Sequence, residues 1–452
     1  MKSYDRRQWL QLVGRGSLGL AALSSLQLGM LPRALAAGRA APTGYKALVC
    51  VFLYGGNDSL NMLIPQGGTA LQDYQAARQS LAVANALPLA PKTAVADGLA
   101  LHPALAALKP LFEENQLALI GGVGALQRPV TKAEYQAGKA IVPANLFSHN
   151  DQQATWMRGS EALKPDSGWA ARLQELLYDV PDFAGNISLA GTNLWQRSAL
   201  LSPFAMSAGG VPVLNAIKGT SSKAKFLQSI QQRLYSGQPD PLALQYAIQH
   251  SQAQQRSEIV GTALLQAPVL QTAFDPANPL AQQLAMVARL ISVQSLLGVG
   301  RQVFFVGIGG FDTHDAQNET QPALLGMLAN ALQSFYQATV ELGVAQQVTS
   351  FTMSDFGRTL SSNGDGTDHG WAGNQLVLGG AVNGGDWYGA LLPQRLGSAV
   401  DVGAGRLIPA LANCQYFAAL AQWFGVSPAD LPLIFPELPA FNSALPQLLR
   451  SA

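Results

Sequence analysis

The chain has 452 residues, of which 48% are hydrophobic and only 12% charged, and its formal net charge is +1. This length and apolar content predict a large buried core in one or two domains. The small net charge provides no general phosphate-neutralising surface, so we expect no nucleic acid as a partner. Its two cysteines, Cys50 and Cys414, exclude a disulfide scaffold and a thiolate metal cluster. Cys50 lies in an apolar run, where we expect a buried free thiol rather than a bridge.

Residues 1–36 have the order of an export signal. Arg6 and Arg7 precede an apolar stretch over residues 18–31, and small residues suitable for cleavage follow at 34–36. The paired arginines are typical of substrates of the twin-arginine translocase, which we expect as a partner during export. The apolar stretch is shorter than the roughly 20 residues that cross a bilayer, and we expect no later segment to span one. We therefore expect a periplasmic or secreted protein with no transmembrane segment in its mature part, residues 37–452.

Apolar runs separated by helical patterns dominate the mature part. Four runs read as buried strands, at residues 45–54, 117–121, 302–307 and 347–353. We expect the first to be a central strand, because it is apolar almost throughout. Helical patterns such as 104–114 and 322–342 lie between the runs. This alternation predicts an α/β fold with a mostly parallel central sheet and helices on both faces.

Residues from about 215 to 300 differ in composition. They are rich in Ala, Gln and Leu at helical spacing, as in 242–266 and 280–297, with no convincing strand. We interpret them as a mainly helical insertion or cap in one α/β domain. Residues 193–210 are rich in Ser, Gly and Asn and predict surface loops.

Polar residues follow the predicted strands, at the edge where open parallel sheets bind ligands. These are Asn57 and Asp58 after the first strand, Asp312 and His314 after the third, Asp355 and Arg358 after the fourth, and then Asp368 and His369. Imidazole and carboxylate together suit a divalent cation, with zinc or manganese favoured and calcium or magnesium as alternatives. The competing interpretation is that these side chains only cap helices or make loop contacts.

Ser148, His149 and Asp151 stand at the start of another helical pattern. Ser148 is well placed as an N-cap, with its hydroxyl at the positive end of a helix. Either capping is all that it does, or it is a nucleophile and His149 or Asp151 contacts substrate or metal. For Arg358, binding a phosphate or sulfate oxygen and pairing with Asp355 or Asp365 remain equal alternatives.

Five motifs in order resemble those of the bacterial family known as domain of unknown function 1501, over essentially the whole mature chain. They occupy residues 51–58 (VFLYGGND), 101–105 (LHPAL), 311–314 (FDTH), 354–359 (SDFGRT) and 368–371 (DHGW). That family is considered related to the alkaline phosphatase and sulfatase superfamily, whose parallel sheet holds metal ions at its strand ends. The resemblance implies metal ligation by Asp58, Asp312, His314, Asp355 and His369.

Two features depart from the superfamily pattern. The spacing from Asp312 to His314 is short, and Phe356 stands where phosphatases often have a second histidine. One metal site is therefore expected to be altered or missing. The superfamily's nucleophile lies at a helix N-terminus, and Ser148 is the one candidate for it in this sequence. Ser148 does not lie in the Cys-x-Pro-x-Arg motif of sulfatases.

Two functional hypotheses follow. The first is an exported metal-dependent hydrolase of phosphate or sulfate esters, in which Ser148 or water attacks and Arg358 holds the ester oxygens. The second is a non-catalytic protein on the same fold that binds an envelope polymer or assists envelope assembly. Convergence of the predicted carboxylates and imidazoles on one point would favour the hydrolase.

Overall fold

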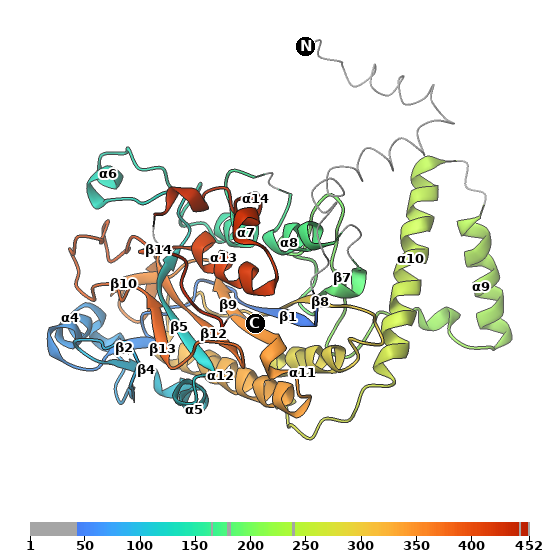
Figure 1. The fold of residues 1–452 in the computed structure, drawn as a ribbon, viewed down its shortest axis with the longest axis horizontal. Coiled ribbons are helices and arrows are strands. Elements are labelled where there is room, and N and C mark those ends of the chain that lie inside the picture. Colours follow the sequence, from blue (N-terminus) through green and yellow to red (C-terminus); the bar gives the residue numbers. More distant parts are fainter. Residues whose placement is uncertain (1–42, 164–165, 179–181, 237–239, 443, 451–452) are drawn as a thin grey trace, which may run out of the picture.

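A computed structural model describes residues 43–450, apart from 164–165, 179–181, 237–239 and 443. The predicted export signal, residues 1–36, lies outside the described residues. The body of the molecule is a twisted sheet between two layers of helices (Figure 1). No helix in the described part of the chain combines the length and hydropathy needed to cross a membrane.

The main sheet is almost entirely parallel, as expected. Its order is β13 (Asp386–Gly389), β5 (Leu117–Gly124), β12 (Gly373–Gly379), β9 (Val348–Ser354), β1 (Lys46–Leu53), β8 (Arg301–Ile308), β6 (Asn186–Ser188) and β7 (Phe204–Ala205), with β14 (Leu411–Ala412) beside β5. Strand β12 alone runs antiparallel to its neighbours β5 and β9 among these described strands. The central position predicted for β1 is confirmed, between β8 and β9.

Strand β1 shows why this sheet needs helices on both faces. Val49 and Val51 face one hydrophobic cluster, whereas Cys50 and Phe52 face the other, and all four side chains are fully buried. One face is covered by α5 (Lys109–Glu113), α11 (Pro279–Ser292) and α12 (Gln317–Glu341), and the other by α7 (His149–Arg158), α8 (Trp169–Leu177), α13 (Asn413–Phe424) and α14 (Leu431–Ile434). Cys50 and Cys414 are both buried and free, as expected for Cys50.

Smaller elements border this core. A short sheet contains β2 (Leu63–Pro65), β4 (Leu99–Leu101) and β3 (Leu87–Leu89), and α4 (Gly68–Arg78) and α6 (Lys132–Gln136) lie in the loops. The hairpin of β10 (Arg358–Ser362) and β11 (Thr367–His369) follows β9 and pairs Arg358 with His369. Two predicted site residues therefore lie opposite each other on one hairpin.

The predicted helical insertion divides into two parts. Helices α9 (Ser222–Tyr235) and α10 (Pro241–Leu264) project from the body (Figure 1). Helix α11 instead packs on α12 and β8, because Leu284, Val287 and Leu290 form a fully buried apolar face. The projecting part is therefore limited to α9 and α10.

Candidate metal centre

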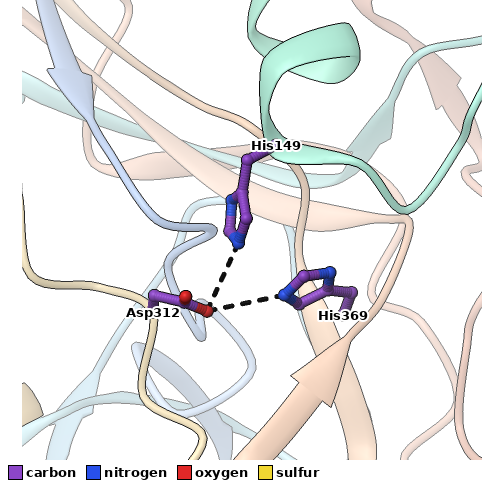
Figure 2. A group of neighbouring side chains, drawn as sticks. All are labelled: His149, Asp312 and His369. Atoms are coloured by element: carbon purple, nitrogen blue, oxygen red, sulfur yellow. Dashed lines mark ion pairs between the residues drawn. The ribbon is translucent and has the colours of Figure 1, made fainter.

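Three side chains from distant parts of the sequence meet beyond the strand ends. His149 is the first residue of α7, Asp312 follows β8, and His369 ends β11 (Figure 2). Their ligand atoms lie within 4.8 Å of one another, an arrangement able to hold a metal ion. The Nε2 atoms of His149 and His369 lie 3.4 and 3.5 Å from Oδ1 of Asp312. The Nε2 of a fourth residue, His314, lies 3.1 Å from the same oxygen, and His149, Asp312, His314 and His369 are called the cluster below.

The other nitrogen of each imidazole, Nδ1, has an acceptor beside it. His149 Nδ1 lies 2.6 Å from Oδ2 of Asp355, and His369 Nδ1 lies 2.7 Å from the carbonyl oxygen of Phe147. His314 Nδ1 lies 3.3 Å from Oδ1 of Asp368. Carbonyl and carboxylate oxygens only accept, so each Nδ1 carries the proton and each Nε2 presents a lone pair. Protein zinc ligands are oriented by partners of this kind.

These lone pairs and the Asp312 carboxylate face a common point. The Nε2 atoms of His314 and His369 are only 2.9 Å apart, so their two lone pairs repel unless a proton or a metal ion lies between them. Among the described residues, the buried His149 Nε2 has no hydrogen-bond partner. A bound cation would interact favourably with the three Nε2 lone pairs and with the Asp312 carboxylate at the same time. Imidazole nitrogens with one carboxylate fit Zn²⁺ or Mn²⁺ better than Ca²⁺ or Mg²⁺, which prefer oxygen ligands.

Local charges set the protonation of the cluster. The hydrogen bond to Asp355 raises the pKa of His149 above its usual value. Burial raises the pKa of Asp312, but the hydrogen bond and charge of Arg358 outweigh it, and the pKa ends below its usual value. Burial lowers the pKa of His369. Asp312 is therefore an anion and His369 a neutral ligand near neutral pH, which suits metal binding, whereas His149 has to release the proton that its raised pKa favours when its Nε2 binds a metal ion.

Asp355, expected as a ligand, is placed behind the cluster instead. Its side chain is fully buried, and Oδ2 accepts from His149, from the backbone N–H of Gly55 at 3.2 Å and from Nε2 of Gln153 at 3.1 Å. Asp355 therefore orients His149. Sequence reasoning did not single out Gln153, although it stands four residues after His149 on α7, the spacing that puts two side chains on one helix face.

Asp58, the other expected ligand outside the cluster, is held in a buried ion pair. Its two oxygens each accept from Arg78 at 2.7 Å, and Oδ2 also accepts from Gln317 at 2.6 Å. Gln317 Oε1 in turn accepts from the hydroxyls of Thr313 at 3.1 Å and Thr367 at 2.7 Å. Asp58 thus supports the loops that carry the cluster rather than joining it.

Arg358 is buried, and its guanidinium makes hydrogen bonds to other groups of the protein. Its guanidinium donates to Asp312 and to four backbone carbonyls, those of Gly55, Gly56, Phe311 and Thr367. Of the two interpretations of the sequence, pairing with a carboxylate matches this geometry, although the partner is Asp312. Arg358 ties together three loops at the strand ends and leaves few donors for a ligand.

The remaining candidates lie around the cluster. Ser148 occupies the N-cap position of α7 as expected, but its side chain makes no capping hydrogen bond. Asp151 is in the first turn of α7 with no recorded contact to the cluster among the described residues. Asn57 is buried at 2% exposure; its backbone N–H donates to Ser354 Oγ at 2.9 Å, so it supports the loop after β1.

Phe356 fills the place next to Asp355 where the resemblance would allow a second histidine. Its ring centroid lies 4.9 Å from that of His149 and 4.7 Å from that of His369. The ring forms an apolar wall against both imidazoles and offers no ligand. This geometry favours one metal ion rather than two.

Fold and site together define an α/β protein with a histidine–aspartate centre beyond the strand ends of a mostly parallel sheet. Residues 45–400 match the family described as "Protein of unknown function (DUF1501)", and the chain belongs to this family. The resemblance drawn from the five motifs is thereby confirmed. No curated protein matches the chain.

Two solved structures show low similarity. One is the lipoteichoic acid synthase LtaP from Listeria monocytogenes, with 9% identity, a TM-score of 0.33, and coverage of 89% of this chain and 79% of that chain. The other is Ps i-CgsB in complex with k-i-k-neocarrahexaose, with 9% identity, a TM-score of 0.32, and coverage of 88% and 76%. At these TM-scores neither likeness carries a conclusion about this chain.

Proposed function

We propose that this protein is an exported, metal-dependent hydrolase of phosphate or sulfate esters. The observation that carries the proposal is the convergence of three imidazole Nε2 atoms, each with its Nδ1 beside an acceptor, on one carboxylate oxygen of Asp312. Their position beyond the strand ends is where an open parallel sheet binds its ligand.

His149, Asp312, His314 and His369 would hold the metal, with zinc preferred and manganese second. A bound divalent ion supplies a Lewis acid that neutralises developing negative charge and lowers the pKa of a hydroxyl or water. The side chains of Asp312 and His314 are 48% and 43% exposed, so the centre is open to an ester from solvent.

The chain's own residues prepare the site. Asp355 and the Phe147 carbonyl keep the protons on Nδ1 of His149 and His369, which leaves both Nε2 atoms free. Arg358 holds Asp312 in place. If water attacks phosphorus or sulfur, it loses a proton, the bond to the ester oxygen breaks, and the departing alkoxide takes up a proton. If Ser148 attacks instead, its hydroxyl proton is lost in the same way, and water must then attack the seryl ester to release phosphate or sulfate and restore the hydroxyl. Ser148 lies at the N-terminus of α7, where helix N–H groups favour negative charge.

Export completes the proposal. The arginine pair Arg6–Arg7 and the following apolar stretch support delivery by the twin-arginine translocase to the periplasm or the medium. Folding before export would let the centre acquire its metal in the cytoplasm.

The test is elemental analysis of protein purified after export without added metal, followed by assays with p-nitrophenyl phosphate and p-nitrophenyl sulfate. We expect near-stoichiometric zinc or manganese and release of nitrophenol from one ester. His369→Ala should lose both, whereas His250→Gln should lose neither, because His250 contacts Tyr235 far from the cluster on α10. Metal-free protein that also fails to take up added zinc would contradict the proposal.

Two observations favour the second candidate, a non-catalytic binding or envelope-assembly protein. The Ser148 hydroxyl makes no hydrogen bond to a base among the described residues, and Arg358 is consumed by internal contacts. Protein that retains its metal but turns over neither ester would support this alternative. Its ligand would then be an anionic envelope polymer or a partner protein.

A further inference from the structure

We propose that Arg406 binds the anionic group of the ligand at this centre. Its Nε donates to the backbone carbonyl of His369 at 3.1 Å, and its guanidinium lies 5.0 Å from the centre of the Phe147 ring. Both neighbours belong to the centre, because His369 is a candidate ligand and the Phe147 carbonyl accepts from its Nδ1. The inference deepens the proposed function and rests on it.

The terminal nitrogens of Arg406 distinguish it from Arg358. Among the described residues, no carbonyl or carboxylate accepts from Nη1 or Nη2 of Arg406, whose recorded side-chain hydrogen bond uses only Nε. The nitrogens of Arg358 instead donate hydrogen bonds to four carbonyls and to Asp312. A guanidinium with two free terminal groups presents a planar pair of donors that matches two oxygens of an anion.

Arg406 is also held by a well-braced turn. The buried Asp401 carboxylate accepts from the backbone N–H groups of Gly397, Gly403 and Gly405 at 2.7, 2.8 and 3.0 Å. The carbonyl of Gly405 accepts from the N–H of Leu360 in β10 at 2.9 Å, which joins the turn to the hairpin that carries the centre. A preorganised arginine loses less entropy when it binds an anion than a mobile one does.

These contacts give the ligand its chemistry. The free edge of the Arg406 guanidinium fits a group with at least two acceptor oxygens. A phosphate or a sulfate group meets this requirement and agrees with the proposed ester hydrolysis. Arg406 would thus supply the anion contact that the sequence suggested for Arg358.

The experiment measures binding of inorganic phosphate and of sulfate to the metal-loaded protein by isothermal titration calorimetry. Loss of a charge-assisted contact predicts affinity about tenfold to a hundredfold weaker in Arg406→Gln. Arg406→Lys should lie between, because it keeps the charge without the planar fork. The control is Arg395→Gln, which removes an exposed arginine of the same segment. Metal content should equal that of the wild type in all three.

The outcomes separate the two proposals. Unchanged anion affinity in Arg406→Gln overturns the role of Arg406 and leaves the hydrolase standing. Wild-type protein that holds its metal but binds neither anion contradicts the proposed function itself. If Arg406→Gln loses metal, phenylglyoxal labelling of the wild type decides the question. Phosphate should slow modification of Arg406 but not of Arg395, and equal rates with and without phosphate overturn the inference.

Discussion

Replacing Asp355 by asparagine should weaken metal binding without touching a ligand. The carboxylate lies behind His149, and its Oδ2 accepts from Nδ1 at 2.6 Å. Asparagine keeps the shape and one acceptor oxygen but removes the negative charge that makes His149 a stronger donor. Alanine is a poorer choice, because it would strand the N–H groups of Gly55, Gln153 and His149 at about 1–3 kcal/mol each.

The expected magnitude follows from the position of Asp355 behind a ligand. Loss of such an outer partner lowers metal affinity by about tenfold to a hundredfold, which corresponds to about 1.4–2.8 kcal/mol of binding free energy. The stabilisation that saturating metal gives the fold should fall by the same amount, because metal binds the folded state.

The assay is a zinc titration in competition with a chromophoric chelator, with thermal unfolding measured in parallel. His149→Ala provides the comparison for complete loss of one ligand. Asp386→Asn is the matched control, since Asp386 also accepts hydrogen bonds, from Thr93, but lies outside the centre. The reasoning is refuted if Asp355→Asn binds zinc as tightly as the wild type while His149→Ala does not.

Four further predictions concern the whole chain. Elemental analysis should find one metal ion per chain, since one group of suitable residues was identified among those the structure describes; two ions would contradict this. Arg78→Met leaves a buried carboxylate unpaired, so the unfolding free energy in urea should fall by about 3–5 kcal/mol, while the folded fraction still binds zinc. Burial raises the pKa of Cys50 and raises that of Cys414 to about 12, so a thiol reagent should label both only in denaturant; labelling of native protein would show exposure. Replacing Arg6 and Arg7 by lysine should abolish export, measured by fractionation, and continued export would argue against the twin-arginine route.

Much of the fold could be predicted because its patterns are local. Four apolar runs became β1, β5, β8 and β9, and the almost uniformly apolar run was the central strand. His102, which directly precedes a predicted helical pattern, caps the turn that follows it: its Nδ1 accepts from the N–H of Ala104 at 3.0 Å. The limits of the projecting insertion were less predictable, because α11 shares with α10 a high content of Ala, Gln and Leu and differs in what its apolar face contacts.

The candidate site was only partly readable from the sequence. Strand-end position brought Asp312, His314 and His369 to attention, and all three lie in the cluster. The same criterion selected Asp58 and Asp355, which serve as supporting residues in the structure. Position after a strand therefore identified the sheet edge at which these side chains gather but not the direction in which each side chain points.

The sequence by itself determined the sheet, its helical layers, the family and the edge at which polar residues gather, because these depend on hydrophobic periodicity and chain order. Only the tertiary structure decided which of those residues lie in the cluster and which pair with other side chains or with the backbone. Arg78 forms an ion pair with Asp58, His149 contacts Asp355, and Arg358 donates to carbonyls of distant loops. The physical reason is that a buried charge or donor must find a partner, and its partner here comes from a segment that no local pattern connects to it.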